Sequence, residues 1–357
     1  MKIIYIIDKP NMYGSEQHLL DLIKYFSQFY NVSLIAFSKG EMLNSLPAIK
    51  TKIFTIKWLR SVLEFIKLYK FIRNEKPDLI HCHQPKALFY GSIIGKILGI
   101  KTLITIHSRA YDHALIHKNL FKKLIVFIFH SCVDFVSKIL ANKIIFVSNK
   151  MYLQSIFKYK SHYISNWLKS DFKYKLNDKE FNIKENINFL TVGSVSKAKG
   201  FDLLMKFFNI LKQNDVKFTS KIYGDIQKKF IKSIVIPSEV KLCGFKKDIK
   251  SEYENADIFI LFSRSETFGL SYLEAMSQGL PIVCLDLDNL KELIPDENIK
   301  VKKITDNIIN LLKEIIKKDN YKKISKINMN KSKEYSYGKK MKQTKRIYEE
   351  MRNKCQK

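Results

Sequence analysis

The chain has 357 residues, a formal net charge of +29 and 46% hydrophobic residues. This length exceeds the size at which one hydrophobic core keeps growing, so we expect two domains. No apolar run reaches the roughly 18 residues of a membrane-spanning helix, and the first ten residues are too short an apolar stretch for a secretory signal. The five cysteines are scattered without metal-like spacing, which favours reduced thiols in a cytoplasmic protein.

The positive charge predicts an anionic partner, which could be nucleic acid, an anionic membrane or an anionic small substrate. The sequence contains no recognition-helix, zinc-finger or RNA-binding signature, so we do not predict nucleic-acid binding. The lysines are spread over both halves and concentrate only in residues 300–357. Compositional drift toward Lys, Ile and Asn is the alternative explanation of the charge.

Strand-like runs alternate with helix-length segments, which is typical of parallel α/β layers. In the first half the predicted strands are 2–8, 31–37, 52–56, 78–83, 101–107, 143–148 and 161–165. The predicted helices between them are 15–29, 58–74, 86–98, 117–140 and 149–157. The second set of predicted strands is 187–194, 218–225, 240–245, 256–263 and 281–286, followed by Lys-rich amphipathic helices from about residue 304.

This pattern predicts two Rossmann-like domains joined by one linker. We expect an N-terminal domain at 1–165, a polar linker at 166–187 and a C-terminal domain at 188–334. We expect the last segment, 335–357, to be a helix that packs back toward the N-terminal domain.

The segment SRSETFGLSYLEAMSQGLPIV, residues 263–283, carries two carboxylates eight positions apart, Glu266 and Glu274. It follows a continuous apolar run that predicts a buried parallel strand, and it continues into a predicted helix that ends near Gly279. Glu266 is therefore expected in the loop at the carboxyl end of a strand, where open α/β sheets bind ligands. Gly269, near the helix start, allows backbone N–H groups to approach a ligand.

This segment resembles the signature of the retaining family-4 glycosyltransferases, in which two glutamates flank seven residues. The resemblance implies the GT-B fold, an α/β architecture of two Rossmann-like domains facing a central cleft. It places Glu266 near the transferred sugar and Glu274 at the ribose hydroxyls of the nucleotide. It also implies that Phe268, Gly269 and Leu270 offer backbone N–H groups to the donor. The alternative is an ordinary strand–loop–helix unit with two solvated glutamates.

Residues 192–204, VGSVSKAKGFDLL, resemble the Gly-Arg…Lys-Gly element with which this family holds the donor diphosphate. A predicted strand ends at Gly193, and Lys199 precedes a predicted helix whose amino terminus favours an anion. Lys199 matches the family lysine, but Ser194 stands at the arginine position. A lysine cannot reproduce a bidentate arginine fork, and Lys197 is a candidate for the missing charge.

Weaker matches lie in the predicted N-terminal domain. Residues 11–20 resemble the family's Gly-Gly-x-Glu loop, with Tyr13 replacing the first glycine and Gly14 allowing close backbone approach. By resemblance, His107 matches a histidine that contacts the donor sugar. A zinc site could use His107 with His81 and His83, but no Cys or carboxylate at ligand spacing completes one, so we predict no metal.

Two further positions of the predicted C-terminal domain follow from the resemblance. Gly244 and Phe245 correspond to the region beside the nucleotide base. In residues 286–294 the family often has Gly-Gly-x-x-Glu, but this chain has Asp288 and Asn289 at the glycine positions. This departure changes the loop on the donor side.

We therefore predict a retaining, metal-independent glycosyltransferase without a cofactor, with Lys199, His107 and Glu266 as catalytic residues. It would move a sugar from a nucleotide diphosphate sugar to a glycan or lipid-linked hydroxyl acceptor in lipopolysaccharide, capsule or other surface-glycan assembly. Residues 115–129 would suit peripheral contact with an anionic membrane, although a core helix is the alternative. Two other functions stay open: a sugar-nucleotide epimerase of the same architecture, and a glycan- or nucleotide-binding protein without catalysis.

Overall fold

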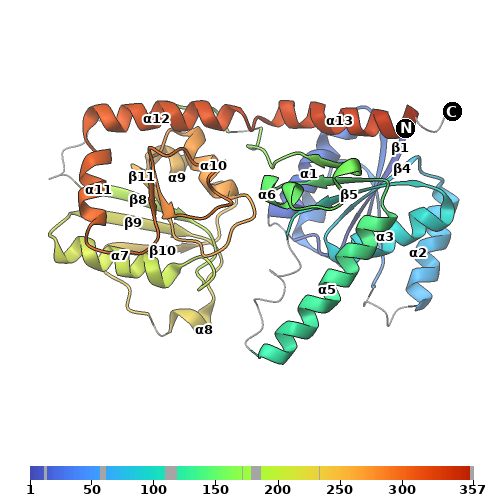
Figure 1. The fold of residues 1–357 in the computed structure, drawn as a ribbon, viewed down its shortest axis with the longest axis horizontal. Coiled ribbons are helices and arrows are strands. Elements are labelled where there is room, and N and C mark those ends of the chain that lie inside the picture. Colours follow the sequence, from blue (N-terminus) through green and yellow to red (C-terminus); the bar gives the residue numbers. More distant parts are fainter. Residues whose placement is uncertain are drawn as a thin grey trace. The chain divides into compact units, whose positions relative to one another are not determined.

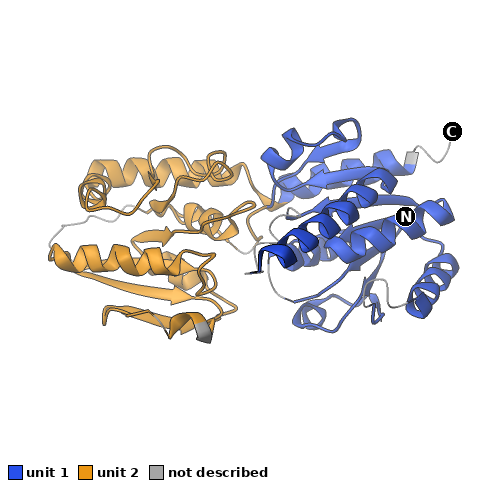
Figure 2. Cartoon of the chain, turned by 60° about the horizontal axis from the view of Figure 1, so that its bottom comes forward, with its two compact units in different colours: residues 1–166, 338–357 blue, residues 167–337 orange. Residues whose placement is uncertain are grey.

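A computed structural model of the chain describes residues 1–11, 14–56, 62–108, 119–170, 172–177, 186–232 and 234–353. The chain forms two compact units (Figure 2). Unit 1 contains residues 1–166 and 338–357, and unit 2 contains residues 167–337. Tyr13, the start of the predicted helix 58–74 and residues 115–118 lie outside the described residues.

Unit 1 is built on a parallel sheet of seven strands in the order β3-β2-β1-β4-β5-β6-β7 (Figure 1). Its strands are β1 (Lys2–Ile7), β2 (Asn31–Ala36), β3 (Lys50–Ile53), β4 (Leu79–His83), β5 (Lys101–Ile106), β6 (Lys143–Phe146) and β7 (Ser161–Tyr163). The central strands are continuous apolar runs because helices cover both faces of a parallel sheet. The edge strand β3 begins two residues earlier and ends three residues earlier than predicted, and its side chains are exposed. An exposed edge strand has no buried face to define its pattern.

The helices of unit 1 follow the strands in alternation. They are α1 (Gly14–Phe26), η1 (Glu41–Ser45), α2 (Val62–Glu75), α3 (Pro85–Leu98), α5 (Leu120–Leu140), α6 (Asn149–Leu153), η3 (Lys158–Lys160) and most of α13 (Tyr337–Asn353). Helix α3 shows how the sequence sets these bounds. Pro85 occupies its first position, and Gly99 ends it with a left-handed φ of 68°.

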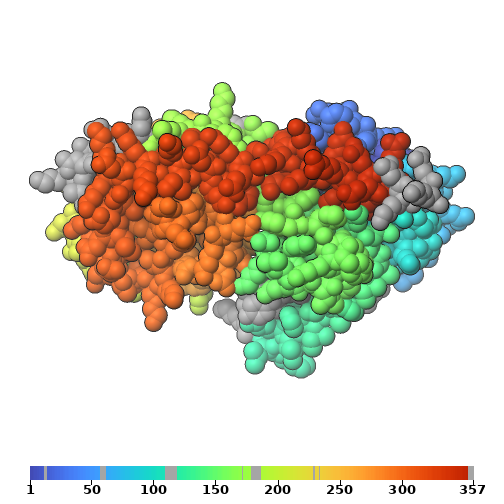
Figure 3. Space-filling view, turned by 45° about the horizontal axis from the view of Figure 1, so that its top comes forward, coloured from blue at the N-terminus to red at the C-terminus, as the bar shows by residue number. Residues whose placement is uncertain are grey.

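The C-terminal helix α13 is joined to the sheet of unit 1 by buried hydroxyl groups. Tyr348 is fully buried, and its hydroxyl lies 2.7 Å from His81 Nδ1 and 2.9 Å from the Tyr5 hydroxyl. Its ring packs against Phe26 of α1 at a centroid distance of 4.6 Å. Figure 3 shows the outer surface of α13, in red, beside the green segments of unit 1. The last helix is thus part of the first unit's fold.

Unit 2 contains a parallel sheet of six strands in the order β10-β9-β8-β11-β12-β13. Its strands are β8 (Ile187–Val192), β9 (Phe218–Tyr223), β10 (Val240–Gly244), β11 (Ile258–Leu261), β12 (Ile282–Leu285) and β13 (Ile299–Val301). Its helices are α7 (Phe201–Gln213), α8 (Lys228–Ile231), α9 (Lys250–Asn255), α10 (Leu270–Ser277), α11 (Ile308–Ile315) and α12 (Lys318–Lys333). The predicted class, α/β with two Rossmann-like units, is confirmed.

Much of the segment expected as a polar linker is packed into unit 2. Trp167, Leu168 and Phe172 are all buried, and Leu168 N donates a hydrogen bond to Tyr335 O at 2.9 Å. Trp167 and Leu168 are adjacent and three polar residues separate them from Phe172, so the segment shows no steady periodicity in sequence. Residues 178–185, also assigned to the linker, lie outside the described residues.

The strand order reverses at one point in each sheet. In unit 1 this point lies between β1 and β4, and in unit 2 it lies between β8 and β11. The chain leaves the two strands at such a point in opposite directions, which opens a crevice at their carboxyl ends. The residues predicted from sequence follow strands at or beside these two points.

Candidate functional site

In unit 2, two of the predicted segments follow neighbouring strands at the switch point. Gly193 and Ser194 follow β8, and Glu266 lies in the loop after β11, which pairs with β8. The loop after β8 continues to Lys199 and into α7. The side chains expected to handle a diphosphate and a sugar therefore share one edge of one sheet.

Lys199 and Glu266 form an ion pair in this crevice. Lys199 Nζ lies 2.6 Å from Glu266 Oε1, and the side chains are 31% and 10% exposed respectively. Gly200 follows with a left-handed φ of 67°, and a Cβ at this position would lie 1.9 Å from Phe262 O. Only glycine allows this approach, which holds Lys199 directly before the amino terminus of α7. A cation and a carboxylate meet there, directly before the positive end of the helix dipole.

Gly193 lies beside the Lys199 side chain, and packing does not require a glycine at this position. A Cβ built on Gly193 would have its nearest neighbours at 3.8 Å, on Leu261 and on the aliphatic stem of Lys199. This is an ordinary van der Waals distance. Ser194, at the family's arginine position, places its hydroxyl 3.2 Å from the Ser196 hydroxyl. A Cβ would therefore fit at Gly193 without a clash.

Glu274 is buried rather than solvated. It lies on α10 with 7% of its surface exposed, and the Tyr253 hydroxyl donates a hydrogen bond to Glu274 Oε2 at 2.9 Å. Lys169 Nζ lies 3.4 Å from its other carboxylate oxygen. Burial raises the pKa of Tyr253, so this hydroxyl keeps its proton and remains a donor. Buried carboxylates are uncommon unless paired, and this one is held in a fixed position.

The turn between the two glutamates is fixed by packing. Gly269 has a φ of 92°, and a Cβ there would lie 2.8 Å from Tyr272 Cδ2. The Phe268 side chain is buried against Tyr335, with ring centroids 5.4 Å apart, so it belongs to the core. Leu270, the first residue of α10, is partly buried against the same cluster. That the three residues offer backbone N–H groups to a ligand stays a prediction.

The predicted base region lies at the end of β10. Gly244 has a φ of 71° with open space around its Cα, and its carbonyl accepts a hydrogen bond from Gly224 N at 2.9 Å. The Phe245 side chain is 59% exposed. An exposed aromatic ring beside an open glycine is suited to stacking against a planar group.

The departure at Asp288 and Asn289 has a structural consequence. Asn289 Nδ2 donates a hydrogen bond to the backbone carbonyl of Glu266 at 2.5 Å. Asp288 forms an exposed ion pair with Lys291 at 3.1 Å. Asn289 thus braces the Glu266 loop, which a glycine could not do.

Arg264 was not predicted from sequence, although it stands two residues before Glu266. Its guanidinium donates hydrogen bonds to both carboxylate oxygens of Asp202 at 2.7 Å and a further one to the carbonyl of Lys197. The Lys197 side chain itself is exposed. Arg264 therefore fixes the loop that carries Lys199. The signal available in the sequence was that this arginine stands two residues before the first signature glutamate, Glu266.

In unit 1, the predicted Gly14 begins α1, and the following turn is tied to the end of β4. Glu16 is buried and accepts hydrogen bonds from Ser15 Oγ at 2.7 Å and Gln84 Nε2 at 3.0 Å. Burial raises the pKa of Glu16. Gln84 has a φ of 70°, a value that non-glycine residues rarely adopt and that marks local strain.

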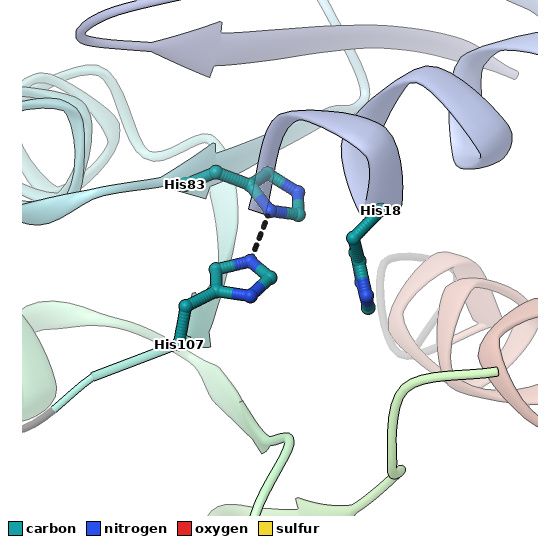
Figure 4. A group of neighbouring side chains, drawn as sticks. All are labelled: His18, His83 and His107. Atoms are coloured by element: carbon teal, nitrogen blue, oxygen red, sulfur yellow. Dashed lines mark hydrogen bonds between the residues drawn. The ribbon is translucent and has the colours of Figure 1, made fainter. Parts of the chain in front are cut away.

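The predicted His107 lies in a cluster of histidines (Figure 4). It follows β5, and its Nε2 lies 3.0 Å from Nδ1 of His83 at the end of β4. His18, on α1, packs edge-on against His107 at a centroid distance of 4.8 Å. Burial lowers the pKa of all three, so the rings are neutral near pH 7. Sequence reasoning missed His18, whose only signal was its position one turn after Gly14.

The predicted residues thus divide between the two units, and in unit 2 Gly244 and Phe245 lie at the edge strand β10 rather than at the switch point. Gly193, Ser194, Lys199, Gly244, Phe245, Glu266, Phe268, Gly269, Leu270 and Glu274 belong to unit 2, while Gly14 and His107 belong to unit 1.

Relatives of known sequence match this chain over most of its length. A glycosyltransferase of Methanocaldococcus jannaschii is 25% identical over 363 residues, which cover 96% of each chain. An enzyme of Escherichia coli described as UDP-Gal:alpha-D-GlcNAc-diphosphoundecaprenol alpha-1,3-galactosyltransferase is 22% identical over 266 residues, covering 68% of this chain and 66% of that one.

Among solved structures, Anabaena HepE in complex with UDP and glucose is similar to this chain with a TM-score of 0.77. The match has 18% sequence identity and covers 98% of this chain and all of that one. Residues 12–157 match the family described as glycosyltransferase family 4, and residues 173–332 match the family described as glycosyl transferases group 1. The two matches span most of both units, and the chain belongs to the family-4, group 1 glycosyltransferases of GT-B fold.

Proposed function

We propose that this protein transfers a sugar from a nucleotide diphosphate sugar to a hydroxyl acceptor. The observation that carries this proposal is the Lys199–Glu266 ion pair at the switch point of unit 2, beside Gly193. A departing diphosphate needs a cation and N–H dipoles, and Lys199 before α7 supplies both. Family membership and the two buried or half-buried glutamates at the signature spacing support the same chemistry.

The residues divide the work between leaving group and nucleoside. Lys199 would neutralise charge that develops on the diphosphate as the bond between the anomeric carbon and the phosphate oxygen breaks. The acceptor oxygen forms the new bond to that carbon, and its proton passes to the released diphosphate. Glu274 would accept hydrogen bonds from two ribose hydroxyls, which a fixed carboxylate does well. Attack on the face that the diphosphate leaves would retain the anomeric configuration, and His107 would contact the sugar.

The proposed transfer does not require a metal ion, because Lys199 and the helix amino terminus neutralise the diphosphate. We expect turnover to persist in excess EDTA. The measurement is nucleotide release with and without chelator, followed by addition of Mg²⁺ or Mn²⁺. Complete loss of turnover in chelator that either ion restores would contradict metal independence.

The proposed donor class is a uridine diphosphate sugar and the proposed pathway is surface-glycan assembly. The support comes from the relatives, since the name of the E. coli enzyme contains a UDP-sugar and a diphosphoundecaprenol-linked acceptor, and HepE binds UDP and glucose. A lipid-linked acceptor would bring this protein to the inner face of the cytoplasmic membrane. No helix among the described residues has the length and apolarity to cross a membrane.

Helix α5 offers a surface for peripheral contact with that membrane. Its amino-terminal half extends away from the sheet of unit 1 in Figure 1. Leu120 and Phe121 are 81% and 72% exposed, and the same half has four more exposed apolar side chains: Leu124, Ile125, Phe127 and Ile128. Lysines lie beside them, and the chain carries a net charge of +29. A core role for residues 120–128 does not agree with this exposure, and an anionic lipid surface fits both properties.

Replacing Phe121 and Leu124 together with Asp should weaken binding to anionic vesicles at least about tenfold. The change removes two apolar side chains that would enter the lipid interface and adds charge of the lipid's sign. The measurement is co-flotation with vesicles of phosphatidylglycerol and phosphatidylethanolamine. Val235→Asp is the matched control, because Val235 is an 83% exposed apolar residue of unit 2. Equal flotation of the double variant and wild type would exclude α5 as the contact.

A further inference from the structure

The histidine cluster of unit 1 has the composition of a metal site that no motif in the sequence indicated. His18, His83 and His107 come from α1, the end of β4 and the residue after β5, and they converge as Figure 4 shows. One ring nitrogen from each lies within 4.8 Å of one from each of the others. His18 and His83 are buried, and His107 is half-buried.

The spacing is close to what a small ion needs. His83 Nδ1 and His107 Nε2 are 3.0 Å apart. Two nitrogens at about 2.0–2.1 Å from a tetrahedral Zn²⁺ lie roughly 3.3 Å from each other. The pair is therefore near ligand spacing, and on binding the proton between the two rings would move to the other nitrogen of the ring that carries it, so that both rings stay neutral. The His18 ring would need to move by about an ångström.

The protonation states also suit a metal ligand. His18 Nδ1 lies 2.9 Å from Asn166 Oδ1, and an amide oxygen can only accept, so Nδ1 carries the proton and Nε2 carries the lone pair. A carbonyl oxygen that fixes the tautomer in this way is the usual outer partner of a metal-bound histidine. Burial keeps the three rings in the neutral form, which is the ligating one.

His83 has one ring nitrogen without a partner in the described part of the chain. It is fully buried, and its Nε2 has no hydrogen-bond partner among the described residues. Buried polar atoms are usually hydrogen-bonded, so an unsatisfied one is uncommon; the His83 atom at ligand spacing is Nδ1, beside His107. The adjacent His81 differs, because its two nitrogens lie 2.7 Å from the Tyr348 hydroxyl and 2.8 Å from Thr105 Oγ1. Among the described residues, both ring nitrogens of His81 have a hydrogen-bond partner, whereas His83 has one only at Nδ1.

We propose that His18, His83 and His107 bind one divalent transition-metal ion of the Zn²⁺ class. Three imidazoles without a carboxylate suit Zn²⁺ and its neighbours rather than Mg²⁺ or Ca²⁺, and they leave a fourth position for water or an anionic ligand. The ion is not a requirement of the transfer. The effect of the ion rests on the proposed function, which places His107 at the donor sugar. An ion bound to His107 keeps that ring from the sugar and so inhibits turnover.

The binding test uses the full-length chain, Zn²⁺ in calorimetric titration and the visible absorption of Co²⁺. We expect one Zn²⁺ per chain and a tetrahedral Co²⁺ spectrum. His18→Gln and His107→Gln should each lose at least about 100-fold in affinity, and Asn166→Ala about tenfold to 100-fold, the scale for an outer-layer partner. His162→Gln is the matched control and should bind as wild type does, because His162 lies on β7 beside Lys143.

Each outcome decides the inference. Absence of binding to wild type, or equal binding by the His18 and His107 variants when their melting temperatures match wild type, overturns it. If either variant fails to fold, Asn166→Ala gives the answer, since its unchanged affinity also overturns it. The binding readout does not depend on activity, so it stands even if no donor is turned over. In an active protein, inhibition by Zn²⁺ should be reversed by chelator.

Discussion

Lys199→Ala should lower kcat by about 100-fold or more, the scale of losing one preorganised charge contact to the transition state. The family's second cation is absent here, because Ser194 stands where an arginine would be and its hydroxyl faces Ser196. Arg264 does not replace it, since its fork is occupied by Asp202. Lys199 therefore carries a larger share of the leaving-group charge than it would beside an arginine.

Three controls separate this charge effect from damage to the loop. Lys197→Ala removes an exposed lysine of the same loop and should leave kcat near wild type. Ser194→Arg should preserve or raise kcat, provided the space beside Gly193 accepts the fork. The Lys199 variant leaves Glu266 without its ion-pair partner, so its melting temperature must be measured alongside the kinetics. Near-normal turnover in Lys199→Ala with a strong loss in Lys197→Ala would assign the diphosphate to Lys197 instead.

Glu274→Ala should weaken binding of a free nucleoside diphosphate by about 1.5–3 kcal/mol, which is roughly ten- to 150-fold in Kd. The ribose hydroxyls would lose a charged acceptor that the fold holds in place through Tyr253 and Lys169. Isothermal titration with UDP and GDP measures the change. GDP serves as the comparison, because the proposed donor is a uridine diphosphate sugar.

The same substitution removes a buried carboxylate, so stability must be checked separately. Glu274→Gln keeps the shape and one acceptor oxygen for Tyr253, and it should lie between Ala and wild type in affinity. Glu252→Ala is a second control: this carboxylate of unit 2 also pairs with lysines, Lys221 and Lys246. Unchanged nucleotide affinity in a folded Glu274→Ala protein would remove Glu274 from the site.

The sequence predicted the parallel strands well because both faces of these sheets are covered. Strands such as β1 and β11 are unbroken apolar runs, and runs of that kind between helix-length segments have few other interpretations. The location of the candidate site in unit 2 followed from the same pattern, since Gly193 and the loop that carries Glu266 come directly after two strands. The pattern could not predict which residue each side chain contacts or hydrogen-bonds.

Contacts between distant segments account for what was missed. In the sequence, Asn289 is only a departure from the family's glycine. In the structure it donates a hydrogen bond to the carbonyl of Glu266, 23 positions away. His18 joins His83 and His107 only because α1 packs beside the ends of β4 and β5. Trp167 and Phe172 are buried in a segment whose polar composition indicated a linker. No local period or propensity records such long-range pairing.

The central claim is glycosyl transfer, and a panel of nucleotide sugars tests it most directly. The protein is incubated with UDP-, GDP- and ADP-sugars, with and without a lipid-diphosphate-linked acceptor, and free nucleoside diphosphate and product are measured. We predict release of nucleoside diphosphate from one donor class, and acceptor should stimulate this release. The product should retain the anomeric configuration of the sugar. Lys199→Ala should strongly reduce the rate of release. An isomerised donor without nucleotide release, as an epimerase would give, or nucleotide binding without turnover of any donor would contradict the account.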